Sequence, residues 1–320
     1  MSETPVVQLE GVARSFGRVL AIAELTLVAP PGSVAVLVGP NGAGKTTAVR
    51  LITGALRPQN GTVRVFGMDP LLQGEAVRQR CGVVSAKPAL YDRLTGRDNL
   101  RYAADLFGVG QGRIPEAAER FGISNALDLR VGGYSTGMKS RLALARAVLH
   151  DPDLLLLDEP TAGLDPEAAR SVLAHIDWMA TTGKTVIMCT HLLLEAEGIA
   201  DQVVIMERGR SVVAGSPAEL AARYWPPQVL LDAEDRDRLF AKVERLKGVV
   251  SFERNGHALV ELDEIGRVPD IIAALAKAGV RLTRVQPRTP TLEELYFAVQ
   301  RGEHGDSVDI GGAEIEEDAS

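Results

Sequence analysis

A glycine-rich segment between an apolar run and a helix-like stretch constrains this chain more than any other feature. The apolar run spans Val34 to Val38, and the helix-like stretch spans Thr47 to Thr53. Such a turn directs successive backbone N–H groups inward, and the helix after it adds the positive end of its dipole. The pattern G-x-x-x-x-G-K-[ST] therefore predicts a strand–loop–helix unit that binds nucleotide phosphates. Its residues are Gly39, Pro40, Asn41, Gly42, Ala43, Gly44, Lys45 and Thr46.

Two side chains of this loop are expected to carry its chemistry. Lys45 should reach the β- and γ-phosphates of ATP, and the Thr46 hydroxyl should ligate Mg²⁺. The three glycines permit a close approach of the backbone to phosphate that a side chain would block. We expect the nucleotide to contact the whole loop and also Thr47, the residue after it.

Two adjacent carboxylates end a second apolar run far downstream. Leu154 to Leu157 has the pattern of a buried strand, and Asp158 and Glu159 follow it directly. In enzymes with such a phosphate loop, an acid at this place binds Mg²⁺, usually through water. Glu159 would lie one residue further and would polarise the attacking water. Together with the loop, the pair indicates hydrolysis of a nucleoside triphosphate.

The stretch from Tyr134 to Pro166 resembles the ATP-binding subunits of ABC transporters. Ser135 and Gly137 match that family's LSGGQ signature. Thr136 replaces a glycine of the signature, and Met138 replaces a glutamine. Two further segments resemble the family's Walker B and D-loop motifs, Asp158-Glu159-Pro160-Thr161 and Ala162-Gly163-Leu164-Asp165. The resemblance covers about residues 5 to 220.

The resemblance implies roles for residues outside the loop. His191 falls at the family's switch histidine and would sense the γ-phosphate, and Phe16 falls where an aromatic ring stacks on adenine. Ser135 and Gly137 would complete the nucleotide site of a second subunit. Asp165 is expected to cap the helix that begins at Pro166, and also to lie at the seam between two subunits.

The chain departs from the family at the Q-loop. By alignment Ala86 takes the place of a glutamine that touches Mg²⁺ and couples to the membrane partner. A methyl group can neither ligate a metal nor orient water. Either Ser85 or Lys87 substitutes, or Thr46, Asp158 and waters alone hold the ion. We expect Ala86→Gln to change the stimulation of hydrolysis by the partner.

Composition excludes several classes of protein. The chain is 46% hydrophobic, a normal globular value, and no run approaches the roughly 20 apolar residues that span a bilayer. The start, Met1 to Pro5, lacks the regions of a signal peptide. The only two cysteines, Cys81 and Cys189, suggest a reducing cytosol and no disulfide framework.

The net charge of −7 comes from one end of the chain. From Glu303 onward there are seven acidic residues and no lysine or arginine, whereas the remaining 302 residues hold 35 basic and 35 acidic residues. The body is therefore neutral and offers no basic field for nucleic acid. We expect residues 302–320 to form a disordered acidic tail.

The alternation of strands and helices predicts a parallel α/β sheet, and the resemblance implies a P-loop NTPase of the ABC ATPase type over residues 1–222, with antiparallel β and helical subdomains. By the same resemblance, the helical subdomain, about residues 88–150, would contact the membrane partner. Helices are expected there at Asp98–Phe107 and Gly137–His150. The sheets would be built from strands at Val6–Leu9, Leu25–Val28, Val34–Val38, Thr62–Phe66, Asp153–Asp158, Thr185–Thr190 and Val203–Met206.

Residues 228–301 have a different pattern and predict a small accessory α+β domain. The order of elements is βαββαβ, a ferredoxin-like candidate. Asn255-Gly256 predicts a two-residue hairpin turn, and Thr291–Gln300 predicts a final helix. The domain carries no catalytic constellation, and we expect it to serve dimer contact or regulation.

Together these features predict an ATP- and Mg²⁺-dependent ATPase subunit that powers a separately encoded membrane permease. By the resemblance it would export drugs, lipids or similar amphiphiles, act as a homodimer, and lie in the cytoplasm on the inner face of the cell membrane. Two alternatives are a soluble ABC ATPase that acts on ribosomes or DNA, and a regulatory nucleotide-binding module with little turnover.

Overall fold

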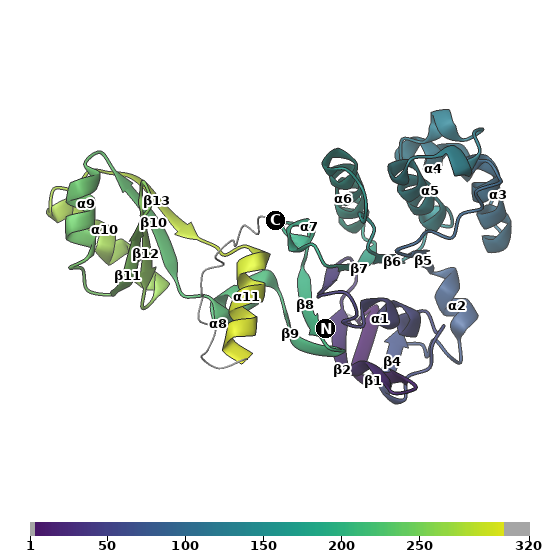
Figure 1. Ribbon diagram of the computed structural model, residues 1–320, viewed down its shortest axis with the longest axis horizontal. Coiled ribbons are helices and arrows are strands. Elements are labelled where there is room, and N and C mark those ends of the chain that lie inside the picture. The colour runs from purple at the N-terminus through teal and green to yellow at the C-terminus, as the bar shows by residue number, and fades with distance from the viewer. Residues whose placement is uncertain (1–3, 304–320) are drawn as a thin grey trace, which may run out of the picture. The chain divides into compact units, whose positions relative to one another are not determined.

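The computed structural model describes residues 4–303, and the chain divides into two compact units, Met1–Ala218 and Glu219–Ser320. Figure 1 shows the elements of both units in the colours of the sequence. No helix in the described part of the chain is both long and apolar enough to cross a membrane. The division falls near the start of helix α8 (Pro217–Tyr224), a little before residue 222.

The first unit is built on a nine-stranded sheet in the order β4-β1-β2-β9-β8-β3-β7-β6-β5. Strands β8, β3, β7, β6 and β5 are parallel to one another, whereas β9 pairs antiparallel with β8, and β1 pairs antiparallel with β2 and β4. The sheet therefore has a parallel part and an antiparallel part. The strands are β1 (Val7–Phe16), β2 (Val19–Ala29), β3 (Val34–Val38), β4 (Asn60–Val65), β5 (Cys81–Val84), β6 (Leu154–Asp158), β7 (Thr185–Thr190), β8 (Gln202–Glu207) and β9 (Arg210–Gly215).

Two predicted strands are too short. The prediction Val6–Leu9 stopped before Glu10 and Gly11, and the prediction Leu25–Val28 left out residues 19–24 at the start of β2. The two strands pair as far as Phe16 and Val19, with register shifts along the way. Backbone pairing between the neighbours thus extends β1 past Glu10 and Gly11, and extends β2 back to the exposed Val19 and Leu20.

The core of this unit lies against both faces of the parallel strands. Every residue of β3, β6 and β7 is buried, which is why these strands read as unbroken apolar runs. Helix α1 (Lys45–Ile52) packs into the same core as β1, β2 and β4. The remaining helices are α2 (Gly74–Gln79), α3 (Gly96–Phe107), α4 (Arg113–Arg120), α5 (Thr136–Val148), α6 (Pro166–Thr181) and α7 (Leu193–Ala196).

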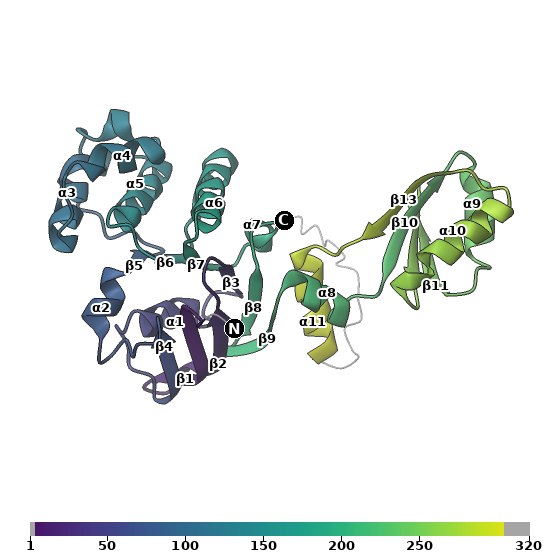
Figure 2. The same cartoon turned by 180° about the vertical axis from the view of Figure 1, so that it is seen from behind.

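Helices α3, α4 and α5 contact one another and form the helical part of the unit, as Figure 2 shows from behind. Capping side chains set the starts of α3 and α5. Thr95 and Asp98 form a capping box, so α3 begins at Gly96 rather than at the predicted Asp98. Ser135 caps α5 and accepts a hydrogen bond from the Met138 N–H.

The second unit has a four-stranded antiparallel sheet in the order β11-β12-β10-β13. Strand β12 lies between β10 and β11, so the unit contains a split βαβ arrangement. Helices α9 and α10 pack on one face and share its core. The elements are β10 (Gln228–Ala233), α9 (Arg236–Val243), β11 (Val249–Arg254), β12 (Ala258–Leu262), α10 (Val268–Lys277), β13 (Leu282–Arg288) and α11 (Leu292–Glu303).

Two predictions for this unit need correction. The hairpin loop has three residues, because Arg254 and Ala258 are the last pair and Asn255 N–H donates to His257 O. Gly256 has φ +69° within that loop, a left-handed conformation that suits three-residue hairpins. The predicted tail began at residue 302, but α11 continues to Glu303, past its buried Val299. The rest of that tail lies outside the described residues.

Candidate functional site

The glycine-rich loop joins β3 to α1 and depends on two glycines for its shape. A Cβ atom at Gly39 would overlap the carbonyl oxygen of Met206. At Gly44, φ is +105° and a Cβ would lie 2.5 Å from Ala21 O. Only glycine combines that backbone conformation with that space. The loop is thus held tightly between strands β2 and β8.

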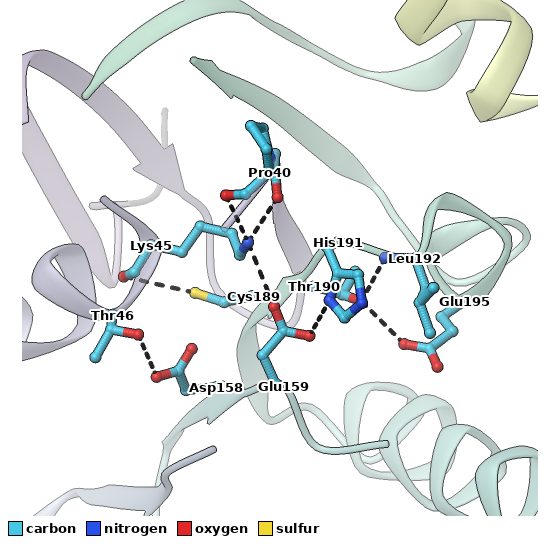
Figure 3. Close-up of polar contacts among 11 residues, drawn as sticks. Pro40, Lys45, Thr46, Asp158, Glu159, Cys189, Thr190, His191, Leu192 and Glu195 are labelled. Carbon is cyan, nitrogen blue, oxygen red and sulfur yellow. Dashed lines mark hydrogen bonds and ion pairs between the residues drawn. The ribbon is translucent and has the colours of Figure 1, made fainter. Parts of the chain in front are cut away.

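Lys45 is the first residue of α1, and its side chain folds back over the loop. Its Nζ donates to Gly39 O at 2.6 Å and to Pro40 O at 3.3 Å, and lies 3.3 Å from Glu159 Oε1. Only 6% of the lysine is exposed. Figure 3 shows the ammonium group between the loop carbonyls and the carboxylate. The buried cation is thus paired, as buried charges must be.

Thr46 and Asp158 meet at the end of β6. The Thr46 hydroxyl donates to Asp158 Oδ2 at 2.7 Å. Burial raises the pKa of Asp158, and the charge of Glu159 adds to the increase, whereas the Thr46 bond opposes it. The other carboxylate oxygen, Oδ1, is buried and has no hydrogen-bond partner among the described residues.

This pair fits Mg²⁺. A buried, unpartnered carboxylate oxygen beside a hydroxyl is a set of hard oxygen donors, which Mg²⁺ prefers. No cluster of three or more His, Cys, Asp or Glu side chains that could hold a metal occurs in residues 4–303.

Glu159 follows Asp158 with an unusual backbone. Its φ is +52°, and its N–H donates to Cys189 O at 2.9 Å on the neighbouring strand β7. A left-handed conformation at a non-glycine residue carries strain of about 1–3 kcal/mol. It occurs where β6 ends, and the Glu159 side chain reaches both Lys45 and His191 (Figure 3).

His191 follows β7 and lies against Glu159. Its Nδ1 is 2.7 Å from Glu159 Oε2. The loop that carries His191 is held by Thr190, which is fully buried. The Thr190 hydroxyl donates to Glu195 Oε2 at 3.0 Å and accepts from Leu192 N–H at 3.0 Å. Thr190 and Glu195 were not predicted from the sequence to support the site. Their only sequence signal is a Thr-His pair with an acidic residue four positions after the histidine.

The signature residues lie in the helical part, at the start of α5. Ser135 and Thr136 are exposed there, and α5 lies with α3 and α4 rather than beside α1 (Figure 1). Asp165 caps α6 by accepting from Glu167 N–H and Ala168 N–H at 3.1 and 2.9 Å. Within the single chain, the described polar contacts form two groups that are adjacent along the chain, Lys45–Glu159–His191 and Thr46–Asp158. Neither group includes Ser135, Gly137 or Asp165.

Phe16 and Ala86 both lie on the surface. Phe16 ends β1 and is 41% exposed, with the Arg14 guanidinium carbon 5.0 Å from the ring centroid. Ala86 is exposed in the loop after β5, and beside it the Ser85 hydroxyl donates to Lys87 O at 2.9 Å. An exposed ring can accept a stacking partner, whereas Ala86 offers no polar atom on its side chain.

Comparisons with known proteins agree with this arrangement. The ABC transporter family profile matches residues 22–162. The daunorubicin resistance ATP-binding protein DrrA3 of Streptomyces coeruleorubidus is 33% identical, over 93% of this chain and 96% of its own length. The Nod factor export ATP-binding protein I of Rhizobium sp. (strain N33) is 37% identical over 70% of this chain and 75% of its own.

The fold is similar to that of solved ABC transporter subunits. A solved ATP-binding subunit of an ABC transporter is 27% identical, with a TM-score of 0.64 over 68% of this chain and 93% of that subunit. The similarity to DrrA3 extends along nearly the whole of both chains, and the matched profile contains the phosphate loop and the Asp158–Glu159 strand end. The chain therefore belongs to the ABC transporter family, as an ATP-binding ATPase subunit.

Proposed function

We propose that this ATPase powers the export of drugs, lipids or similar amphiphiles through a separately encoded membrane permease. Two relatives support this assignment, since one is named for daunorubicin resistance and the other for Nod factor export. The chain spans nearly the full length of the first relative. In such a system the subunit lies in the cytoplasm, on the inner face of the cell membrane. Its function does not require binding to nucleic acid.

The convergence of five side chains at the carboxyl ends of β3, β6 and β7 carries the proposal. Lys45 binds the β- and γ-phosphates of ATP. Thr46 and Asp158 hold Mg²⁺, which when bound neutralises charge on the phosphate oxygens. Glu159 accepts a proton from the attacking water, and His191, in contact with Glu159 Oε2, responds to the γ-phosphate. Phe16 stacks on adenine.

A second copy of the chain would complete each site. We place the exposed Ser135 and the half-buried Gly137 of one subunit against the nucleotide bound by the loop of the other, with Asp165 at the seam. The start of α5 supports this role, because its first backbone N–H groups form an anion-binding end. Hydrolysis then changes the equilibrium between closed and open dimers.

The test of this function has two parts. The first compares ATP turnover of the wild type with that of Glu159→Gln, and a difference is expected because glutamine cannot accept the proton. The second purifies Glu159→Gln protein with ATP from gently solubilised native membranes and identifies its partners by mass spectrometry. A stoichiometric multi-spanning partner would support the exporter. Ribosomal or DNA-associated partners instead would favour a soluble ABC ATPase.

A regulatory module with little turnover is the second candidate, and two residues favour it. Ala86 lacks the polar group of the Q-loop glutamine, and Thr136 replaces a signature glycine. Equal turnover by the wild type and Glu159→Gln, with tight ATP binding by both, would select this candidate over the exporter ATPase.

A further inference from the structure

Ser85 is the first residue after β5, the strand beside the one that Asp158 ends. Strands β5 and β6 are parallel neighbours, and their last matched pair is Val84 with Leu157. The residue after each member of that pair is Ser85, which is exposed in the loop after β5, and Asp158, which is the last residue of β6. Parallel strands lie about 4.8 Å apart, and ligands of α/β sheets bind beyond the carboxyl ends of the strands. Ser85 therefore begins the loop at the edge where Asp158 ends its strand.

The alternation of side chains puts these two positions on the same face. Cys81 and Val83 of β5 belong to the hydrophobic cluster that contains α1, as do Leu154 and Leu156 of β6. Successive side chains of a strand point to opposite faces. Asp158 comes two residues after Leu156 and therefore lies on the same face as Leu154 and Leu156. If the alternation continues one residue past the end of β5, Ser85 lies on the same face as Cys81 and Val83. The α1 face is the one from which Thr46 reaches Asp158.

Of the three neighbours Ser85, Ala86 and Lys87, Ser85 alone has a side chain with the chemistry to bind a cation. Its hydroxyl hydrogen is donated to Lys87 O, which leaves the oxygen lone pairs available to accept. Thr46 has the same arrangement, with its hydrogen on Asp158 Oδ2. A charged Lys87 has three donors and no acceptor, and the Ala86 side chain has neither.

We propose that the Ser85 hydroxyl oxygen is a further ligand, direct or through one water, of the Mg²⁺ held by Thr46 and Asp158. This inference rests on the proposed nucleotide site. It resolves the alternatives left at the Q-loop in favour of Ser85. The ion is hard and takes oxygen donors, and the unpartnered Oδ1 of Asp158 lies on the same strand end.

The experiment measures metal affinity and does not depend on turnover. Mn²⁺ replaces Mg²⁺ as the probe, and electron paramagnetic resonance titrates free Mn²⁺ against full-length Glu159→Gln protein saturated with ATP. Adding Ser85→Ala should weaken Mn²⁺ binding about tenfold, the lower end of the effect of removing a supporting metal contact. Ser85→Thr, which keeps the hydroxyl, should restore it. ATP affinity in excess chelator should be the same in all three proteins.

Two further variants sharpen the result. Lys87→Ala should leave Mn²⁺ affinity within about twofold, because no ligand is removed. Ala86→Gln in the Ser85→Ala background should recover affinity by supplying an amide oxygen at the neighbouring position. Unchanged Mn²⁺ affinity in Ser85→Ala, with ATP and metal still bound, would overturn the Ser85 inference alone. Failure of the Glu159→Gln parent to bind ATP or Mn²⁺ would overturn the proposed function instead.

Discussion

The two units of this chain distribute polar residues over their sheets in opposite ways. In the first unit, β3, β6 and β7 are buried along their whole length, and the polar groups gather where these strands end. In the second unit, β10 and β12 alternate between buried and half-buried residues. Its outer face carries side chains such as Asp232, Glu261 and Arg284.

The difference explains where chemistry can occur. A sheet covered on both faces has reactive groups only at its edge, where several strand ends bring them together. There Glu159 lies within 3.3 Å of Lys45 and 2.7 Å of His191, and the adjacent Asp158 accepts from Thr46 at 2.7 Å. A sheet covered on one face spreads its charges over a surface instead. We therefore assign ATP turnover to the first unit and expect the second to tolerate changes of charge.

The largest expected effect tests that assignment directly. Glu159→Gln should lower ATP turnover by about 10²- to 10⁴-fold, the usual contribution of a general base, while ATP still binds. The matched control is Glu253→Gln on the exposed face of β11, which should leave turnover unchanged. Phosphate release and ATP titration measure the two quantities. A large loss of turnover in the control would contradict the assignment of turnover to the first unit alone.

A core truncation in the second unit should separate stability from activity. Leu231 is fully buried in β10, and Leu231→Ala should destabilise that unit by about 2–5 kcal/mol. Turnover of the isolated ATPase should stay within about twofold, because Lys45, Thr46, Asp158, Glu159 and His191, to which we assign turnover, all belong to the first unit. Calorimetry should show one shifted transition and one unshifted transition. A parallel fall of both transitions would show that the units unfold together.

The loop that carries His191 offers a smaller and more specific effect. Thr190→Val removes the hydroxyl that joins Glu195 to Leu192 N–H, and Glu195→Ala removes its acceptor. Each change should lower kcat by about tenfold with little change in KM, the pattern of lost transition-state positioning. Glu195→Gln keeps an acceptor oxygen and should recover most of the rate. In a His191→Ala background the Glu195 effect should disappear, since positioning acts through that ring.

The smallest expected effect is a gain in stability. Because burial raises the pKa of Asp158, the folded chain binds that proton more tightly than the unfolded chain. The stabilising contribution is complete at low pH and is lost as pH rises through the elevated pKa. Asp158→Asn should therefore have a higher melting temperature than the wild type at pH 8. The increase should be about 2–4 °C for each kcal/mol of destabilisation that the substitution removes. The difference in melting temperature should decrease as pH falls.

A control for that gain comes from a carboxylate with the opposite shift. The Arg97 side chain donates to Asp128 and lowers its pKa. Asp128→Asn should lower the melting temperature or leave it unchanged, since the charged form is the one favoured in the folded protein. Mg²⁺ with ATP should stabilise the Asp128 variant as it does the wild type, but should no longer stabilise Asp158→Asn.

Contiguous motifs explain what could be predicted from the sequence. Lys45 and Thr46 are adjacent in one loop, and Asp158 ends a run whose burial is visible in its composition, so the contact between Thr46 and Asp158 could be expected. Most elements of the second unit could also be placed, because their apolar residues alternate clearly. The spacing of apolar residues along the sequence shows which residues are buried. Elements whose position depends mainly on burial can therefore be predicted from that spacing.

Other features depend on contacts that no local pattern contains. Residues 10–16 of β1 and residues 19–24 of β2 lack a clear strand pattern, and they are strands because they pair with each other. Glu195 reaches Thr190 only because the chain turns after β7 into the short helix α7. The hairpin at Gly256 has a third residue because Asn255 N–H bonds His257 O, a register that depends on the strands beside it.

The backbone conformation at Glu159 creates a conflict between stability and turnover at this position. Its φ of +52° is a conformation that glycine adopts without strain, so glycine there would favour folding and remove the carboxylate. In a library of variants selected only for resistance to heat, residue 159 should drift toward glycine. In a library selected for turnover, glutamate should persist. The composition at this one site would then report which of the two properties a population had been selected for.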